Sequence, residues 1–270
     1  MSAVPTRVVL DYLLHHGYLA TAAALADDTQ GTIDVPRMDA TASDRVRQRA
    51  AIYRSIEQGQ IERAYALCQS HFPTVLADDT PSTSTPPASS TVTYTLDPSL
   101  LSLNMQLQQL VEYLRSLYTC EDADDEPLET AVRWADTLRT RIDALPPDAH
   151  AAYATELEQL MGLFAYRCLD DVPETLAPAL HLSRRSALAQ QVNSAILQAE
   201  GTLPTSLLSR VTRQAACTWD HLHDRAVVIP RDHPSVALIG PTRCTSVADG
   251  VIPPPLDWLT QPSSMAFDRP

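Results

Sequence analysis

The sequence predicts an all-α protein, and three observations lead to that fold class. Apolar residues recur every three or four positions through successive segments, the spacing that places them on one face of a helix. Glycine or proline stands where several of these segments stop, as at Gly17, Gly59 and Pro146-Pro147. Hydrophobic residues make up 44% of the chain, enough to form a core, so global disorder is not expected. Prolines interrupt the pattern later, and we expect an irregular, proline-rich tail over residues 226–270.

The first expected element is a helical hairpin within residues 5–37. Apolar residues follow helical spacing up to the His15-His16 pair, and Gly17 can adopt the left-handed conformation that ends a helix. A second apolar run extends from Leu19 to Leu25. Isolated helices of this length are marginal in water, so the hairpin needs a partner for its apolar face.

Two adjacent histidines, His15 and His16, could be metal ligands or residues of a helix end. Neighbouring side chains on a helix point about 100° apart, so the two rings do not easily reach one ion. A side chain with cationic character also suits the exposed carbonyls of a last helical turn. We therefore interpret both histidines as helix-end residues.

A second helical hairpin is expected in the stretch RQRAAIYRSIEQGQIERAYALCQSHFPTVL. Ser43 or Asp44 can cap its first helix, which Gly59 ends. Its second helix ends before Phe72-Pro73. The next residues, 78–98, are rich in Ser, Thr and Pro and lack the apolar content to fold, so we expect an exposed loop.

Helical periodicity resumes after residue 100 in the segments LLSLNMQLQQLVEYLRSLY, LETAVRWADTLRTRI, YATELEQLMGLFAYR, SRRSALAQQVNSAIL and LLSRVTRQAACTWDHL. Asn193 lies inside one of these helices, where a buried amide is expected to have a hydrogen-bond partner. The acidic stretch CEDADDEP is interpreted as a solvated linker, because it has neither glycine nor the regular Asp spacing of a calcium loop.

Composition argues against several classes of protein. The net charge of −13 does not suit nucleic-acid binding, whose affinity comes mostly from neutralised phosphates. No apolar run approaches the ~18 residues of a membrane span, and no apolar core after a charged start indicates a secretory signal. Five cysteines are scattered without CxxC spacing, which favours reduced thiols over disulfides or a zinc site.

No catalytic motif is recognisable, whether GxSxG, P-loop, HExxH or GxGxxG. His221 and His223 are two residues apart in an expected helix, so their side chains do not face each other. Cys217 and His221 share a helix face, but such a pair is usually structural. No run of Cys and His pairs indicates a RING domain. We expect no catalytic residue, cofactor or metal.

Three stretches resemble, in order, the motifs of the LisH–CTLH–CRA family. The first hairpin resembles LisH, with Leu25 where that motif usually has Phe, and the second hairpin resembles the core of CTLH. The matches to CRA are Gln108, Val111, Glu112, Leu114, Arg115, the pair Arg184-Arg185 and the run from Val192 to Leu197. The resemblance implies a LisH dimerisation hairpin over 5–37, CTLH over 41–100 and CRA over 101–225.

This resemblance implies a non-catalytic scaffold of a GID/CTLH-type E3 ubiquitin ligase, acting in the cytoplasm and nucleus in the proteasomal degradation of target proteins. The partners would be other LisH–CTLH–CRA proteins, including Ran-binding protein M-like and RING-bearing subunits, in homo- or hetero-dimers. Neither nucleic acid nor membrane would be a partner. Two alternatives stay open: a cytoskeletal adaptor related to microtubules or dynein, and a small-molecule enzyme with His221 or His223 beside a carboxylate.

Two sets of residues are expected at protein interfaces. The LisH set comprises Val9, Tyr12, Leu13, Gly17, Tyr18, Ala22 and Leu25. The CTLH and CRA set comprises Tyr53, Ile56, Leu107, Leu110, Leu114, Arg184, Arg185, Val192 and Ile196.

The chain contains no lysine, so arginine supplies all its basic side chains apart from histidine. The favoured interpretation is codon usage in a GC-rich genome, because asparagine and phenylalanine are also scarce. The alternative is a protein that offers no side-chain amines to the ubiquitin ligase it belongs to.

Overall fold

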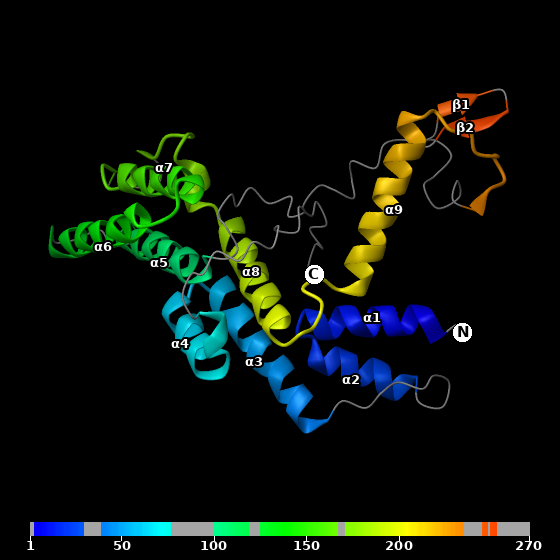
Figure 1. The fold of residues 1–270 in the computed structure, drawn as a ribbon, viewed down its shortest axis with the longest axis horizontal. Coiled ribbons are helices and arrows are strands. Elements are labelled where there is room, and N and C mark those ends of the chain that lie inside the picture. The colour runs from blue at the N-terminus through cyan, green and yellow to red at the C-terminus, as the bar shows by residue number, and fades with distance from the viewer. Residues whose placement is uncertain are drawn as a thin grey trace. The chain divides into compact units, whose positions relative to one another are not determined.

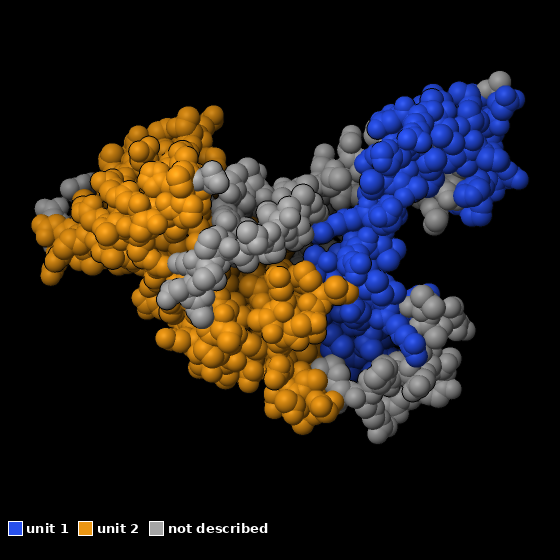
Figure 2. Space-filling view, in the orientation of Figure 1, with its two compact units in different colours: residues 1–15, 20–35, 205–270 blue, residues 16–19, 36–204 orange. Residues whose placement is uncertain are grey.

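The computed structural model describes residues 3–29, 39–76, 100–118, 125–166, 171–234, 245–247 and 249–252. It confirms the all-α prediction, since helices dominate the described chain and strands form one small hairpin (Figure 1). The chain divides into two compact units (Figure 2). Unit 1 comprises residues 1–15, 20–35 and 205–270, and unit 2 comprises residues 16–19 and 36–204. The loop expected at 78–98 and most of the acidic stretch lie outside the described residues.

Unit 1 brings the first and last helices of the chain together. It holds α1 (Ala3–His15), most of α2 (Leu19–Asp28) and α9 (Leu207–Asp224). The helices α1 and α9 pack against each other. The carboxylate of Asp11 on α1 accepts a hydrogen bond of 2.7 Å from the backbone N–H of Leu207, which opens α9. An acidic side chain at this position also suits the positive end of the α9 dipole. The boundary between unit 2 and unit 1 follows Pro204, so it divides the range 101–225 that was expected for CRA.

The turn between α1 and α2 forms as its glycine predicts. Gly17 has φ of +77°, in the left-handed region that side-chain-bearing residues rarely adopt. A Cβ atom on this residue would also lie 2.6 Å from the Cβ of Ala50, too close for both to stay in place. His15 closes α1, but His16 lies beyond the helix end. Burial lowers the pKa of His16 and the charge of Arg49 lowers it further, so this ring favours its neutral form, contrary to the expected cationic role.

The first core of unit 2 lies among α3 (Ala40–Glu57), α4 (Ile61–His71), α5 (Leu101–Leu117) and α8 (Ser183–Ala199). Gly59, with φ of +77°, turns the chain from α3 into α4, as expected. The cap of α3 differs from the expectation. Asp39, not Ser43 or Asp44, accepts a hydrogen bond of 2.6 Å from the N–H of Ala42, so the helix begins a turn earlier. The apolar spacing did not show this, because the first turn of α3 contributes no buried residue.

The second core of unit 2 joins the opposite side of α5 to α6 (Asp125–Asp143) and α7 (Pro147–Leu163). Pro147 occupies the first turn of α7, where a missing N–H costs little, and so α7 begins earlier than its apolar pattern suggested. Leu107 and Leu110 of α5 contribute to this core and are fully buried. Two 3-10 segments, Pro73–Val75 and Ala177–Leu180, complete the described elements of the unit.

The tail is more ordered than the sequence predicted. Strands β1 (Thr245–Val247) and β2 (Gly250–Ile252) form an antiparallel hairpin in which Ser246 pairs with Val251. Val251 also forms a bridge with Ile229, which lies just beyond α9. Each strand has three residues, too short for an alternating apolar pattern, so the expectation of a wholly irregular tail was wrong for this segment.

Truncation of the buried Leu110 is expected to destabilise unit 2. Leu110→Ala removes a fully buried side chain and should lower the free energy of unfolding by about 2–5 kcal/mol. Urea denaturation followed by circular dichroism measures the loss. Leu203→Ala, at a position 57% exposed in the same unit, is the control and should change stability by less than about 0.5 kcal/mol. Equal losses in the two variants would contradict the packing.

Candidate protein-interaction surfaces

The first set of expected interface residues lies on and beside the helices of unit 1. Val9 is 41% exposed and Tyr18 is 56% exposed. Tyr12, Leu13 and Leu25 are half-buried. Ala22 is buried, and Gly17 forms the turn. Large apolar side chains on this pair of short helices therefore keep part of their surface in water.

Most of the second set lies in the core of unit 2 and not on its surface. Six side chains are at most 2% exposed, namely Ile56, Leu107, Leu110, Leu114, Val192 and Ile196. These side chains stabilise the fold. Because they are enclosed, they are not part of the proposed interface. Tyr53 is half-buried against the first core. The apolar spacing could not distinguish these positions from interface positions, because both give the same period.

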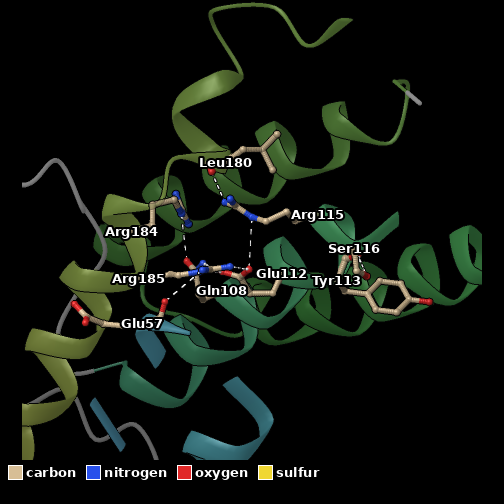
Figure 3. Close-up of polar contacts among 9 residues, drawn as sticks. All are labelled: Glu57, Gln108, Glu112, Tyr113, Arg115, Ser116, Leu180, Arg184 and Arg185. Atoms are coloured by element: carbon tan, nitrogen blue, oxygen red, sulfur yellow. Dashed lines mark hydrogen bonds and ion pairs between the residues drawn. The ribbon is translucent and has the colours of Figure 1, made fainter. Parts of the chain in front are cut away.

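Arg185 of α8 forms a two-point ion pair with Glu112 of α5 (Figure 3). Its Nε and Nη2 donate to the two carboxylate oxygens over 2.7 and 2.5 Å. Gln108 donates to the same carboxylate over 2.8 Å. Burial alone would raise the pKa of Glu112, but these hydrogen bonds and the charges of Arg185 and Arg115 outweigh it and hold the pKa below its usual range. The hydrogen bond to Glu112 in turn raises the pKa of Arg185.

The neighbouring arginines extend this contact to other segments of unit 2. Arg184 pairs with Glu156 of α7 over 2.5 Å. Arg115 donates to the backbone carbonyl of Leu180 and lies 3.5 Å from Glu112 (Figure 3). We call Glu112, Arg115, Glu156, Arg184 and Arg185 the arginine clamp. Its contacts are within the chain, so the two arginines expected at an interface hold α5, α7 and α8 together.

A buried arginine, Arg49 of α3, also contacts α8. It is 5% exposed and donates to the amide oxygen of Asn193 over 2.8 Å. The partner expected for the buried Asn193 amide is therefore Arg49. Glu200 lies 3.9 Å from Arg49 and 3.1 Å from Arg45, which places a carboxylate near the buried charge. Arg49 was not predicted as a buried residue. No pattern in the neighbouring sequence indicates that this arginine is buried, because its hydrogen-bond partner, Asn193, is 144 residues away.

Catalytic and metal-binding chemistry finds little support in the described part of the chain. No group of three or more His, Cys, Asp or Glu side chains there could hold a metal ion. His221 is exposed and His223 half-buried near the end of α9. Cys217 is exposed, whereas burial raises the pKa of the Cys68 thiol to about 12, so Cys68 stays protonated at neutral pH. Among the described helices, none has the length and apolar character to cross a membrane.

An exposed apolar stripe on α9 was not expected from the sequence. Leu207 is 41% exposed and Val211 is 54% exposed, and they lie one turn apart on the helix. Leu203, just before the helix, is 57% exposed. The sequence predicted a helix here, but helical spacing alone does not show whether an apolar face is covered.

Comparisons with known proteins identify a matching family and a similar protein. Residues 45–220 match the family described as the CTLH/CRA C-terminal to LisH motif domain. The sequence is also 25% identical over 227 residues to the glucose-induced degradation protein 8 homolog of Nematostella vectensis. That alignment covers 83% of this chain and 82% of the relative. The family match includes the arginine clamp but not the first hairpin, whose likeness to LisH rests on its own residues.

Removal of the Glu112 charge is expected to weaken unit 2 at neutral pH. Glu112→Gln leaves the half-buried Arg185 without its carboxylate and should cost about 1–3 kcal/mol of unfolding free energy. Because folding lowers the pKa of Glu112, its stabilisation is complete above the unfolded value of about 4.3 and is lost as the pH falls through the folded value.

Urea denaturation of both proteins at pH 7 and at progressively lower pH measures this difference. The gap between wild type and Glu112→Gln should shrink in acid. Asp44→Asn, which removes an exposed i,i+3 ion pair with Arg47, is the control and should cost less than about 0.5 kcal/mol. A gap that is constant with pH, or equal to the control, would contradict the role of the ion pair.

Proposed function

Because the chain belongs to the CTLH/CRA C-terminal to LisH motif domain family, we propose that it is a non-catalytic scaffold subunit of a GID/CTLH-type E3 ubiquitin ligase. It would link the substrate-receptor arm to RING-bearing subunits, and so direct target proteins to the proteasome. The name of the similar Nematostella vectensis protein, glucose-induced degradation protein 8 homolog, supports this complex over others. The observation that carries the proposal is the set of half-exposed apolar side chains on the first hairpin.

The assembly step would be burial of the LisH hairpin against a hairpin of another subunit or of a second copy. Val9, Tyr12, Leu13 and Leu25 supply the apolar area. Removing apolar surface from water yields about 25 cal/mol per Å², and interfaces of about 1,600 Å² are typical of stable complexes. Area alone does not fix the affinity, because association also costs rotational and translational freedom.

Unit 2 would act as the rigid part of the scaffold. Its two apolar cores and the arginine clamp fix α5, α7 and α8 relative to one another. A scaffold must hold its docking points at constant separation, and ion pairs with little exposure restrict sliding of one helix along another. Partners would be Ran-binding protein M-like and RING-bearing LisH–CTLH–CRA proteins, met in the cytoplasm and nucleus.

Charge on the hairpin is expected to disrupt assembly. The double variant Tyr12→Asp with Leu13→Asp places two carboxylates where apolar contact is proposed, and it should reduce the oligomeric mass or abolish binding to the RING-bearing partner. Size-exclusion chromatography with light scattering measures the mass, and circular dichroism verifies helix content. Leu182→Asp, at a site 55% exposed in unit 2, is the control and should leave the mass unchanged. An unaltered assembly of the double variant argues against the proposal, and recovery of tubulin or dynein factors would favour the cytoskeletal adaptor.

Substitution of arginines by lysines tests whether the absence of lysine protects the chain from ubiquitination. Arg47→Lys, Arg63→Lys and Arg133→Lys change exposed helix positions while keeping the positive charge. If lysine is excluded to avoid modification, the triple variant should be ubiquitinated in the reconstituted ligase, whereas the parent chain should not be modified on side chains. Triple substitution of the same arginines by glutamine is the control. No modification of the lysine variant would leave codon usage as the explanation.

A further inference from the structure

An apolar groove runs along α9 in unit 1 from Val211 to Leu222, and the proposed function makes no use of it. The groove encloses about 690 Å³. Its lining includes a small cluster in which Trp219 and Leu222 pack against Ile229. Its sides include Val211 and Ala215 of α9, and Val228 from the following segment.

The groove leaves large apolar groups in contact with water. Val211 is 54% exposed and Val228 is 44% exposed, and both line the groove. Single exposed apolar residues are common on protein surfaces, but several around one concave site usually indicate a surface that something covers. A groove of this size accommodates a few apolar side chains.

The last described residues of the chain lie beside this groove. Ile229, which lines the groove, exchanges two backbone hydrogen bonds of 2.8 Å with Val251 of β2. The strand ends one residue later, at Ile252. The sequence that follows is PPPLDWL, residues 253–259. These residues are therefore tethered next to the groove. Their effective concentration at the groove is high because they belong to the same chain.

The length of this segment matches the groove. From Val211 to Leu222 the α9 axis rises about 16 Å at 1.5 Å per residue. Seven residues in a polyproline conformation span about 22 Å at 3.1 Å per residue. The segment can therefore reach along the whole groove without unpairing β2.

The chemistry of the segment also suits the groove. Proline-rich segments lose little conformational entropy on binding, and they dock in grooves that contain aromatic rings. Trp219 supplies such a ring. Leu256, Trp258 and Leu259 are large apolar residues just after the prolines, and an aromatic side chain buries about 150–250 Å².

From these observations we propose that residues 253–259 dock into the α9 groove of their own chain, with Trp258 as the main anchor. The contact covers the apolar surface of unit 1 from within the molecule. It is independent of the LisH hairpin and of any ligase subunit, so it goes beyond the proposed function.

Photocrosslinking of the full chain tests the location. Benzoyl-phenylalanine replaces Trp258 in an equal mixture of isotopically light and heavy protein, and crosslinked peptides are identified by mass spectrometry. We expect crosslinks to residues 211–222 or 228–233 that join only light to light or heavy to heavy peptides. The same probe at Phe267, outside the segment, is the control. Mixed light–heavy pairs would show docking on a second copy and overturn the proposal, as would the absence of crosslinks to the groove.

Hydrogen exchange of the full chain tests the role of the anchor. Trp258→Ala should accelerate amide exchange in residues 226–234 by about tenfold, because an anchoring aromatic contact is lost. Phe267→Ala is the matched control and should leave these rates unchanged. Exchange in unit 2 should be the same in both variants, which verifies that the fold is intact. Unchanged exchange in Trp258→Ala contradicts the proposal.

Discussion

Burial of α5 between two apolar cores is the constraint on which unit 2 depends. One side of the helix presents Leu101 and Met105 to α3, α4 and α8, and the other presents Leu107 and Leu110 to α6 and α7. A helix buried on two sides cannot rotate without exposing one apolar face. Its orientation therefore fixes both halves of the unit at once, and a single change on α5 affects helices of both cores.

Polar groups on the same helix determine how its neighbours align. Asn104, Gln108 and Glu112 follow each other at four-residue spacing, so they form one polar line along a mostly buried helix. Asn104 accepts from the Tyr153 hydroxyl over 2.7 Å, Gln108 donates to Glu112, and Glu112 pairs with Arg185. Buried polar groups are costly when unpaired, so sliding α7 or α8 by one turn along α5 would break several contacts together. Apolar packing alone would tolerate such a slip far better.

Unit 1 leaves a larger share of its apolar side chains exposed to water than unit 2 does. Its described helices leave Val9, Leu207 and Val211 partly in water, although α1 and α9 pack against each other. A unit with this much exposed apolar surface is suited to contacts with other chains or other segments. Unit 2 encloses most of its large apolar residues in two cores, although a few, such as Leu182 and Leu203, are exposed. The family to which the chain belongs and its likeness to a glucose-induced degradation protein 8 homolog are consistent with a protein that functions through such contacts.

The sequence alone determined the order and approximate bounds of the helices, because helical spacing and the turns at Gly17 and Gly59 depend on neighbouring residues. It could not determine which apolar faces were enclosed. Ile56 and Val9 follow the same period, yet one lies in a core and the other is exposed, because burial depends on segments distant in the chain. The pairing of Glu112 with Arg185, 73 residues apart, was likewise decided by tertiary structure, since no local signal indicates which charges will meet once the helices pack.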